Sequence, residues 1–166
     1  MQLNLTTGYA VRVLVYLAEE NGNICSSAEM SERLKISQKY LMRISKKMRD
    51  AGFLASHPGN VGGYSLARPP EQIRLYDVAL LMEGTVKLHR CLEEDHYCSQ
   101  KIAATCRTLH CFAVMQVYWE NFLKRITIAD LAAGLSVEEV QRRITGPPGA
   151  EGEGQDHEHK EQTDKR

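Results

Sequence analysis

Two short helical patterns joined by a tight link, over 28–34 and 38–51, constrain the fold more than any other feature. Ser26 precedes the first pattern with Glu29 three residues later, the spacing of a capping box, and Ser37 precedes the second pattern. The second pattern places its large apolar residues three and four positions apart, on one buried face. Two helices separated by so short a turn predict a helix-turn-helix motif.

The second of these helices has a one-sided charge distribution. The interval 33–49 contains seven basic residues and no acidic one, and the basic side chains of the helix fall on the face away from the apolar stripe. A lone helix of this kind is usually just solvated, but the second helix of such a pair enters the major groove of DNA. Gln suits adenine edges there, and Arg or Lys suits guanine edges. The candidate DNA-contacting residues are Ser37, Gln38, Lys39, Tyr40, Arg43, Lys46 and Lys47.

A β-hairpin is predicted directly after this helix. Strand-like runs over 53–57 and 64–67 flank a loop rich in Gly and Pro, and a hairpin in this position is the wing of a winged helix. The glycines of the loop allow the chain to turn, and they also let the backbone approach DNA phosphates closely. We therefore add Asn60, Gly62 and Gly63 to the candidate DNA contacts.

The segment after the wing contains most of the cysteines and shows no helical or strand periodicity. Six, seven and four residues separate Cys91, Cys98, Cys106 and Cys111. Structural zinc uses pairs two to four residues apart, so zinc is disfavoured. Thiolates are the ordinary ligands of iron–sulfur clusters, but unlinked thiols fit the spacing as well, and the spacing leaves both open. We expect no enzyme and no catalytic residue, because no His or Asp pattern accompanies any one cysteine.

A long helix is predicted over about 109–124, with a near-heptad apolar stripe that suits pairing with another helix. The residues assigned to a dimer interface are Phe112, Met115, Trp119, Phe122 and Ile126. Packing of this stripe inside one chain is the alternative. Capping-box signals at Thr127 and Ser136 predict two short terminal helices.

These patterns predict a mainly α chain with a small β-hairpin wing. Helical patterns over 6–20 and 75–83 complete the part around the helix pair and the wing. The predicted segments are a winged helix-turn-helix DNA-binding domain over 1–84, a cysteine-bearing loop over 85–110, a dimerisation helix with short terminal helices over 111–146, and a disordered acidic tail over 147–166.

The composition fits a globular protein. The sequence has 166 residues, of which 43% are hydrophobic and 25% charged, and this excludes a collagen-like or wholly disordered chain. No apolar stretch reaches the roughly 18 residues needed to cross a bilayer, and the first residues lack the apolar region of a secretory leader. Five cysteines without such a leader predict reduced thiols and a cytoplasmic location. The zero net charge divides into about +3 on residues 1–146 and an acidic tail.

Several motifs occur in order along residues 1–135. They are Tyr9-Ala10-Val11, Ile36-Ser37 followed by Tyr40-Leu41, Gly52-Phe53-Leu54, Gly62-Gly63-Tyr64, and three cysteines before a long helix that ends in the run 126–131. Each motif is weak by itself, but the ordered set resembles the Rrf2 family of winged-helix transcription regulators. Members of that family include an iron–sulfur cluster regulator and a nitric-oxide-sensing repressor.

The resemblance implies a cofactor and a mode of assembly. In the cluster-binding members three cysteines hold an iron–sulfur cluster, and by position these match Cys91, Cys98 and Cys106. We expect a 2Fe–2S rather than a 4Fe–4S cluster, with His110 or Cys111 as the fourth ligand. A homodimer built on the long helix would bind double-stranded DNA at a two-fold symmetric operator. Its affinity for DNA would respond to cluster or iron supply, redox state or nitric oxide.

Two other functions remain open from the sequence. The first is a regulator of the same fold without a cluster, which senses redox through thiols or acts with a protein partner. The second is an iron–sulfur electron carrier, which leaves the acid-free interval 33–49 unexplained.

Overall fold

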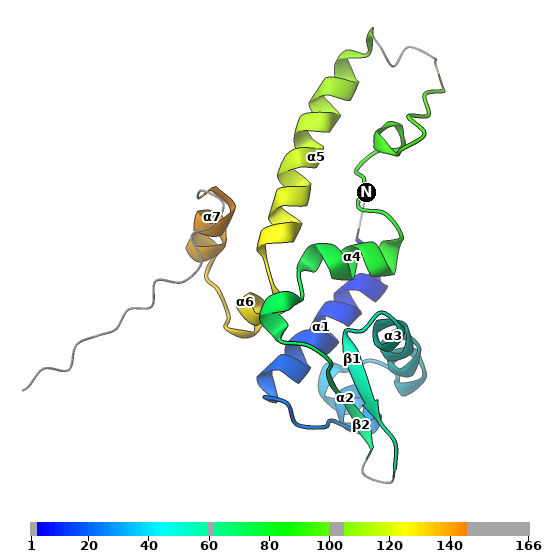
Figure 1. Cartoon of the computed structure of the whole chain (residues 1–166), viewed down its shortest axis with the longest axis vertical. Coiled ribbons are helices and arrows are strands. Elements are labelled where there is room, and N and C mark those ends of the chain that lie inside the picture. Colours follow the sequence, from blue (N-terminus) through cyan, green and yellow to red (C-terminus); the bar gives the residue numbers. More distant parts are fainter. Residues whose placement is uncertain (1–2, 60–61, 100–104, 146–166) are drawn as a thin grey trace, which may run out of the picture.

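A computed structural model describes residues 3–59, 62–99 and 105–145 of the chain (Figure 1). The elements in order are α1 (Leu5–Glu19), α2 (Ser27–Leu34), α3 (Gln38–Asp50), β1 (Leu54–His57), β2 (Gly63–Leu66), η1 (Pro70–Gln72), α4 (Leu75–Glu83), η2 (Arg90–Leu92), α5 (Arg107–Arg125), α6 (Ile128–Ala132) and α7 (Val137–Thr145). The predicted fold class, mainly α with a two-stranded hairpin, is confirmed. None of the described helices is long and apolar enough to cross a membrane.

The helix-turn-helix forms as its local signals predict. The Ser26 hydroxyl accepts a hydrogen bond from the Glu29 backbone N–H at 3.1 Å and starts α2. Lys35 adopts the left-handed conformation (φ 54°) that ends α2, and α3 begins after Ser37. The Ser37 side chain makes no capping hydrogen bond, so this predicted cap acts only by position. The tight link sets the two helices against each other.

The wing consists of β1 and β2, which pair antiparallel with Leu54 opposite Leu66 and His57 opposite Gly63. A single bridge from Cys25 to Tyr64 attaches the wing to the turn before α2. The hairpin therefore has a fixed orientation relative to the helix pair.

One continuous core unites these elements with α4 and α6 around α1. The chain returns to this core after α5, because the Leu75 N–H donates to Ile126 O at 2.9 Å and the Ile128 N–H donates to Ile73 O at 2.8 Å. Ile128 is fully buried, so α6 packs with the N-terminal elements and not with the long helix that precedes it. We call residues 3–84 together with α6 the body.

Helix α5 projects from the body, and residues 85–99 run alongside it (Figure 1). We call residues 85–99 and 105–125, which include α5, the arm. A small apolar cluster of Ala79, Val86 and Leu123 joins the arm to α4. Helix α5 begins at Arg107, two residues before its predicted start, so His110 and Cys111 belong to the helix and not to a loop before it.

Candidate nucleic-acid interface and cysteine segment

Helix α3 presents its basic residues to solvent. Leu41, Ile44 and Met48 are buried, as their spacing predicts. The opposite side exposes four basic side chains, which we call the basic face: Lys39, Arg43, Lys46 and Lys47. A cluster of cations on an exposed helix surface favours binding to the phosphates of nucleic acid.

Two predicted DNA contacts on α3 are held by neighbouring side chains. Gln38 Nε2 donates to Ser27 Oγ at 3.1 Å, which ties the first turn of α3 to α2. The Arg43 guanidinium lies 4.4 Å from the centre of the Tyr40 ring, a cation–π contact. The Tyr40 hydroxyl in turn lies 2.5 Å from the Thr6 hydroxyl. Tyr40 therefore positions Arg43 and connects it to the start of α1.

The start of α1 is also bound to the end of α4, a connection that sequence analysis missed. The Glu83 carboxylate accepts hydrogen bonds from the Asn4 backbone N–H (2.9 Å), from Asn4 Nδ2 (2.7 Å) and from the Thr7 hydroxyl. Asn4 also caps α1, which begins at Leu5, one residue before its predicted start. Residue 83 lies two positions before the arm, so this contact connects the chain segment that enters the arm with the helix that contacts Tyr40.

The glycines of the wing have structural reasons of their own. A Cβ on Gly63 would lie 2.1 Å from Cys25 O, and one on Gly62 would lie 2.3 Å from His57 O. Both positions therefore exclude any side chain, whether or not DNA is bound. Contact of Gly62 and Gly63 with DNA stays a prediction, and Asn60 lies outside the described residues.

The five cysteines occupy different environments. Cys25 is buried, and burial raises the pKa of its thiol, so it is a poor thiolate. Cys91, Cys98 and Cys106 are half-buried and free, and Cys111 is exposed. Among residues 3–59, 62–99 and 105–145 no group of three or more His, Cys, Asp or Glu side chains comes together as a metal site.

Cys91 and Cys106 each have a polar side chain as a partner. Cys91 Sγ lies 3.1 Å from His89 Nδ1. Cys106 caps α5, and its Sγ lies 3.0 Å from the Thr108 hydroxyl. The hydrogen bond with Thr108 and backbone N–H groups at the helix start lower the pKa of the Cys106 thiol. Thiolates of this kind are the donors that bind iron and zinc.

The five residues predicted for the dimer interface do not share one environment: most pack within the same chain and one is exposed. Trp119 and Phe122 stack with ring centres 6.2 Å apart and pack on the small cluster of the arm, and Ile126 is buried in the same chain. Phe112 stacks on His89, and Met115 is exposed. The stripe is therefore mostly used within one chain. The exposed apolar residues, which we call the outward face, are Val114, Met115, Val117 and Tyr118.

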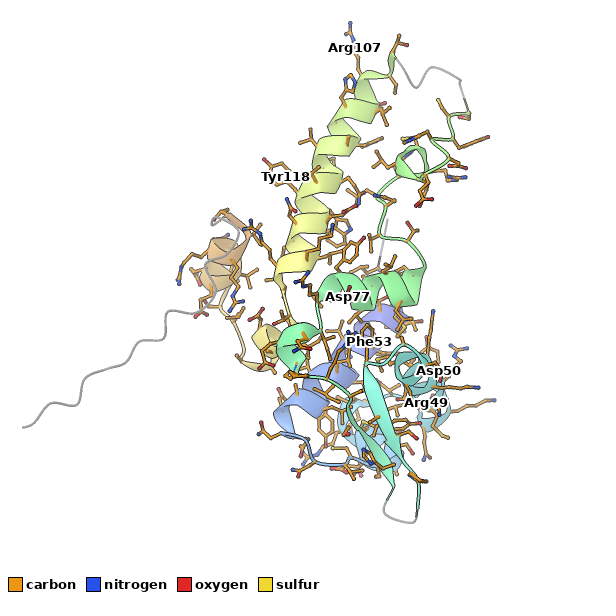
Figure 2. The ribbon with its side chains drawn as sticks, viewed as in Figure 1. Arg49, Asp50, Phe53, Asp77, Arg107 and Tyr118 are labelled. Carbon is orange, nitrogen blue, oxygen red and sulfur yellow. The ribbon has the colours of Figure 1, made fainter. Side chains whose placement is uncertain are left out.

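The outward face lies on the side of α5 away from residues 85–99. Figure 2 shows Tyr118 directed away from that segment, and its side chain is 69% exposed. Arg107 marks the end of α5 farthest from the body. An apolar strip along one side of a helix is a feature of helix–helix interfaces.

Comparison with known proteins identifies the family. The sequence model of the Rrf2 family, described as iron-dependent transcriptional regulators, matches residues 3–134. The chain belongs to the Rrf2 family. The expectation drawn from the motifs is confirmed, and this Rrf2 protein is a DNA-binding transcription regulator and not an enzyme.

Relatives and solved structures agree with this assignment. The HTH-type transcriptional regulator IscR of Cereibacter sphaeroides is 42% identical over 89 residues, which cover 52% of this chain and 57% of the relative. The structure of IscR from T. potens is similar with a TM-score of 0.61 and 25% identity, covering 82% of this chain and 93% of the other. The structure of CymR, the global cysteine regulator of B. subtilis, has a TM-score of 0.62 at 24% identity and covers 82% and 99% of the two chains.

Proposed function

We propose that this Rrf2 regulator binds a two-fold symmetric operator as a homodimer, with an affinity set by an iron–sulfur cluster on Cys91, Cys98 and Cys106. The observation that supports it most is the donor chemistry of the arm. All three thiols are free and half-buried, and they lie on the segment between the body and α5. This donor set fits a cluster, which takes thiolates with His replacing Cys in some cases.

The basic face would enter the major groove. Arg43 has the donors for a guanine edge, and Gln38 has the donor and acceptor for an adenine edge. Lys46 and Lys47, farther along α3, would contact phosphates, which give affinity without sequence preference.

A second copy of the chain would cover the outward face. Pairing of two α5 helices through Val114, Met115 and Tyr118 removes apolar surface from water at roughly 25 cal/mol per Å². Such a pair would also relate the two α3 helices by two-fold symmetry, as a two-fold symmetric operator requires.

Control of DNA affinity would pass from the arm to the basic face. Cys91, Cys98 and Cys106 would hold the cluster, and their bonds to iron would restrain the positions of these three residues. Loss or nitrosylation of the cluster would remove that restraint. Glu83, two positions before the arm, binds the start of α1, whose Thr6 contacts Tyr40, and the Tyr40 ring contacts Arg43. A coupling of about 1–3 kcal/mol through this connection would change DNA affinity roughly 5- to 150-fold.

Anaerobic purification of wild type and single Cys→Ala variants tests the proposal. Iron and sulfide content and the visible spectrum should show a cluster in wild type, and its loss in the Cys91, Cys98 and Cys106 variants. Cys25→Ala is the matched control and should keep the cluster, because Cys25 is buried in the body. If wild type has no iron, the regulator works without a cluster and thiol-based sensing takes its place. If all three variants keep the iron, Cys91, Cys98 and Cys106 are not the ligands and the proposal is wrong.

A further inference from the structure

We infer that His89 is the fourth cluster ligand and that its Nδ1 binds the same iron as Cys91. The inference rests on the proposed function, since it concerns the cluster proposed there. Residue 89 stands two positions before the first cysteine, where the sequence pattern gives no reason to look for a ligand.

The hydrogen bonds of His89 fix which ring nitrogen is free to bind a metal. Nδ1 accepts the Cys91 backbone N–H at 3.4 Å, so the neutral ring has its proton on Nε2. The lone pair of Nδ1 therefore points toward Cys91, whose Sγ lies 3.1 Å away and donates its S–H to it. A metal ion in place of that thiol proton would be bound by sulfur and nitrogen at once.

The separation of the two donor atoms is close to the distance that such binding needs. Metal–sulfur and metal–nitrogen bonds of about 2.3 and 2.0–2.1 Å at a tetrahedral ion place the two ligand atoms roughly 3.5 Å apart. The observed 3.1 Å would need to open by only a few tenths of an ångström. An exposed two-residue turn can supply that movement by a small side-chain rotation.

Helix α5 holds the imidazole ring in this orientation. The His89 and Phe112 rings stack with centres 4.9 Å apart and an interplanar angle of 18°. The residue before His89 is also held by α5, because the Leu88 N–H donates to Gln116 Oε1 at 2.8 Å. The ligand pair is therefore positioned by contacts that do not depend on a bound metal.

The two other candidates for the fourth ligand, His110 and Cys111, lie on sides of α5 that do not face residues 85–99. Phe112 and Gln116 face residues 85–99, and Glu120, one turn farther on, receives Lys87 Nζ at 2.9 Å. At about 100° per residue, His110 lies roughly 160° around α5 from Phe112, and Cys111 about 100°. Both are exposed. The geometry favours His89 over both residues that the sequence offered.

Pulsed EPR on the reduced cluster tests the assignment, because a directly bound nitrogen gives a strong hyperfine coupling. We expect that coupling in wild type, its loss in His89→Phe, and its retention in His110→Ala and Cys111→Ala. The Phe variant is the matched change, since it keeps a ring on Phe112 and removes only the nitrogen donors. A coupling that persists in His89→Phe, or is absent from a wild type that contains the cluster, overturns the inference and leaves the proposed function intact. A wild type without iron overturns both.

His89→Cys covers the case in which His89→Phe binds no iron. A thiolate at this position should restore wild-type iron content, abolish the nitrogen coupling and lower the reduction potential, because imidazole ligation raises it. Circular dichroism confirms that the variants are folded. If folded His89→Cys and His89→Phe both lack iron while His110→Ala retains it without a nitrogen coupling, His89 is structural and not a ligand.

Discussion

The body and the arm bury their apolar residues in different ways. In the body, α1, α3, α4 and α6 contribute to one core, and Leu14 and Ile128 are fully buried there. In the arm, α5 has a covered side and a bare side, with Val117 59% exposed. The covered side is attached as much by polar groups as by apolar ones, through Gln116 and Glu120.

Because of this difference, we expect substitutions in the body and on the outward face to change different properties of the protein. The body completes its core within one chain, so substitutions there should change the free energy of unfolding. The outward face gains nothing from the chain's own fold, so substitutions there should change association with a second copy. The following predictions test that separation.

Leu14→Ala should have the largest effect on stability. Removal of this fully buried side chain leaves a cavity in the body and should lower the free energy of unfolding by about 2–5 kcal/mol. Urea denaturation followed by circular dichroism measures it. Ile24→Ala, at a position 49% exposed, is the control and should cost less than about 1 kcal/mol. Equal costs at the two positions would contradict the packing of the body.

Met115→Glu should weaken the dimer while leaving the chain folded. A carboxylate buried between two outward faces lacks a partner, and we expect the dimer dissociation constant to rise at least 30-fold, or about 2 kcal/mol. Sedimentation velocity over a dilution series measures it. Leu80→Glu makes the same kind of change at an exposed position of α4 and should leave the dimer intact. An unchanged dimer in Met115→Glu would remove the outward face from the interface.

Arg43→Ala should lower affinity for an operator selected from random duplexes by about 1–3 kcal/mol. Lys46→Ala should instead weaken binding to every DNA sequence by the same factor. It should also reduce the magnitude of the slope of log binding constant against log salt concentration by about 0.9, because one phosphate fewer is neutralised. Binding titrations at several salt concentrations distinguish the two. Lys124→Ala, in the arm, should change neither quantity, and an effect as large as that of Arg43→Ala would make the arm part of the DNA interface.

Glu120→Gln should have the smallest effect and a defined pH dependence. Lys124, Lys87 and Gln116 bond the carboxylate and lower the pKa of Glu120 from 4.5 to about 2. The ionised form is thus favoured by folding, so its contribution is complete above about pH 4.5 and is lost as the pH falls toward 2. The pairs are partly exposed, so we expect about 1 kcal/mol at neutral pH.

Urea denaturation of wild type and Glu120→Gln at neutral and acidic pH measures this contribution. The difference in unfolding free energy between the two proteins should shrink as the pH falls below about 4.5. Glu94→Gln, at an exposed position of the arm, is the control and should show little difference at either pH. A difference for Glu120→Gln that grows on acidification would contradict the arrangement around this carboxylate.

Local sequence signals predict the ends and the buried faces of several helices. Helix α4 ends at Glu83 as predicted because Gly84 adopts the left-handed conformation, with φ 80°, which glycine adopts more easily than other residues. The capping box at Thr127 and Asp130 starts α6, and the spacing of apolar residues on α3 fixes its buried face. These signals act between residues a few positions apart, so they are visible in the order of the residues alone.

The contacts between these elements, in contrast, depend on how distant parts of the chain pack together. The contacts between Asn4 and Glu83, separated by 79 positions, and between Thr6 and Tyr40, separated by 34, depend on the packing of α1 against α3 and α4. The placement of α5 likewise assigned Trp119 to the chain's own core, left Met115 in solvent and set Phe112 against His89. Helical spacing gives the relative angles of side chains around one helix, but the neighbour that each face meets depends on the position of every other element.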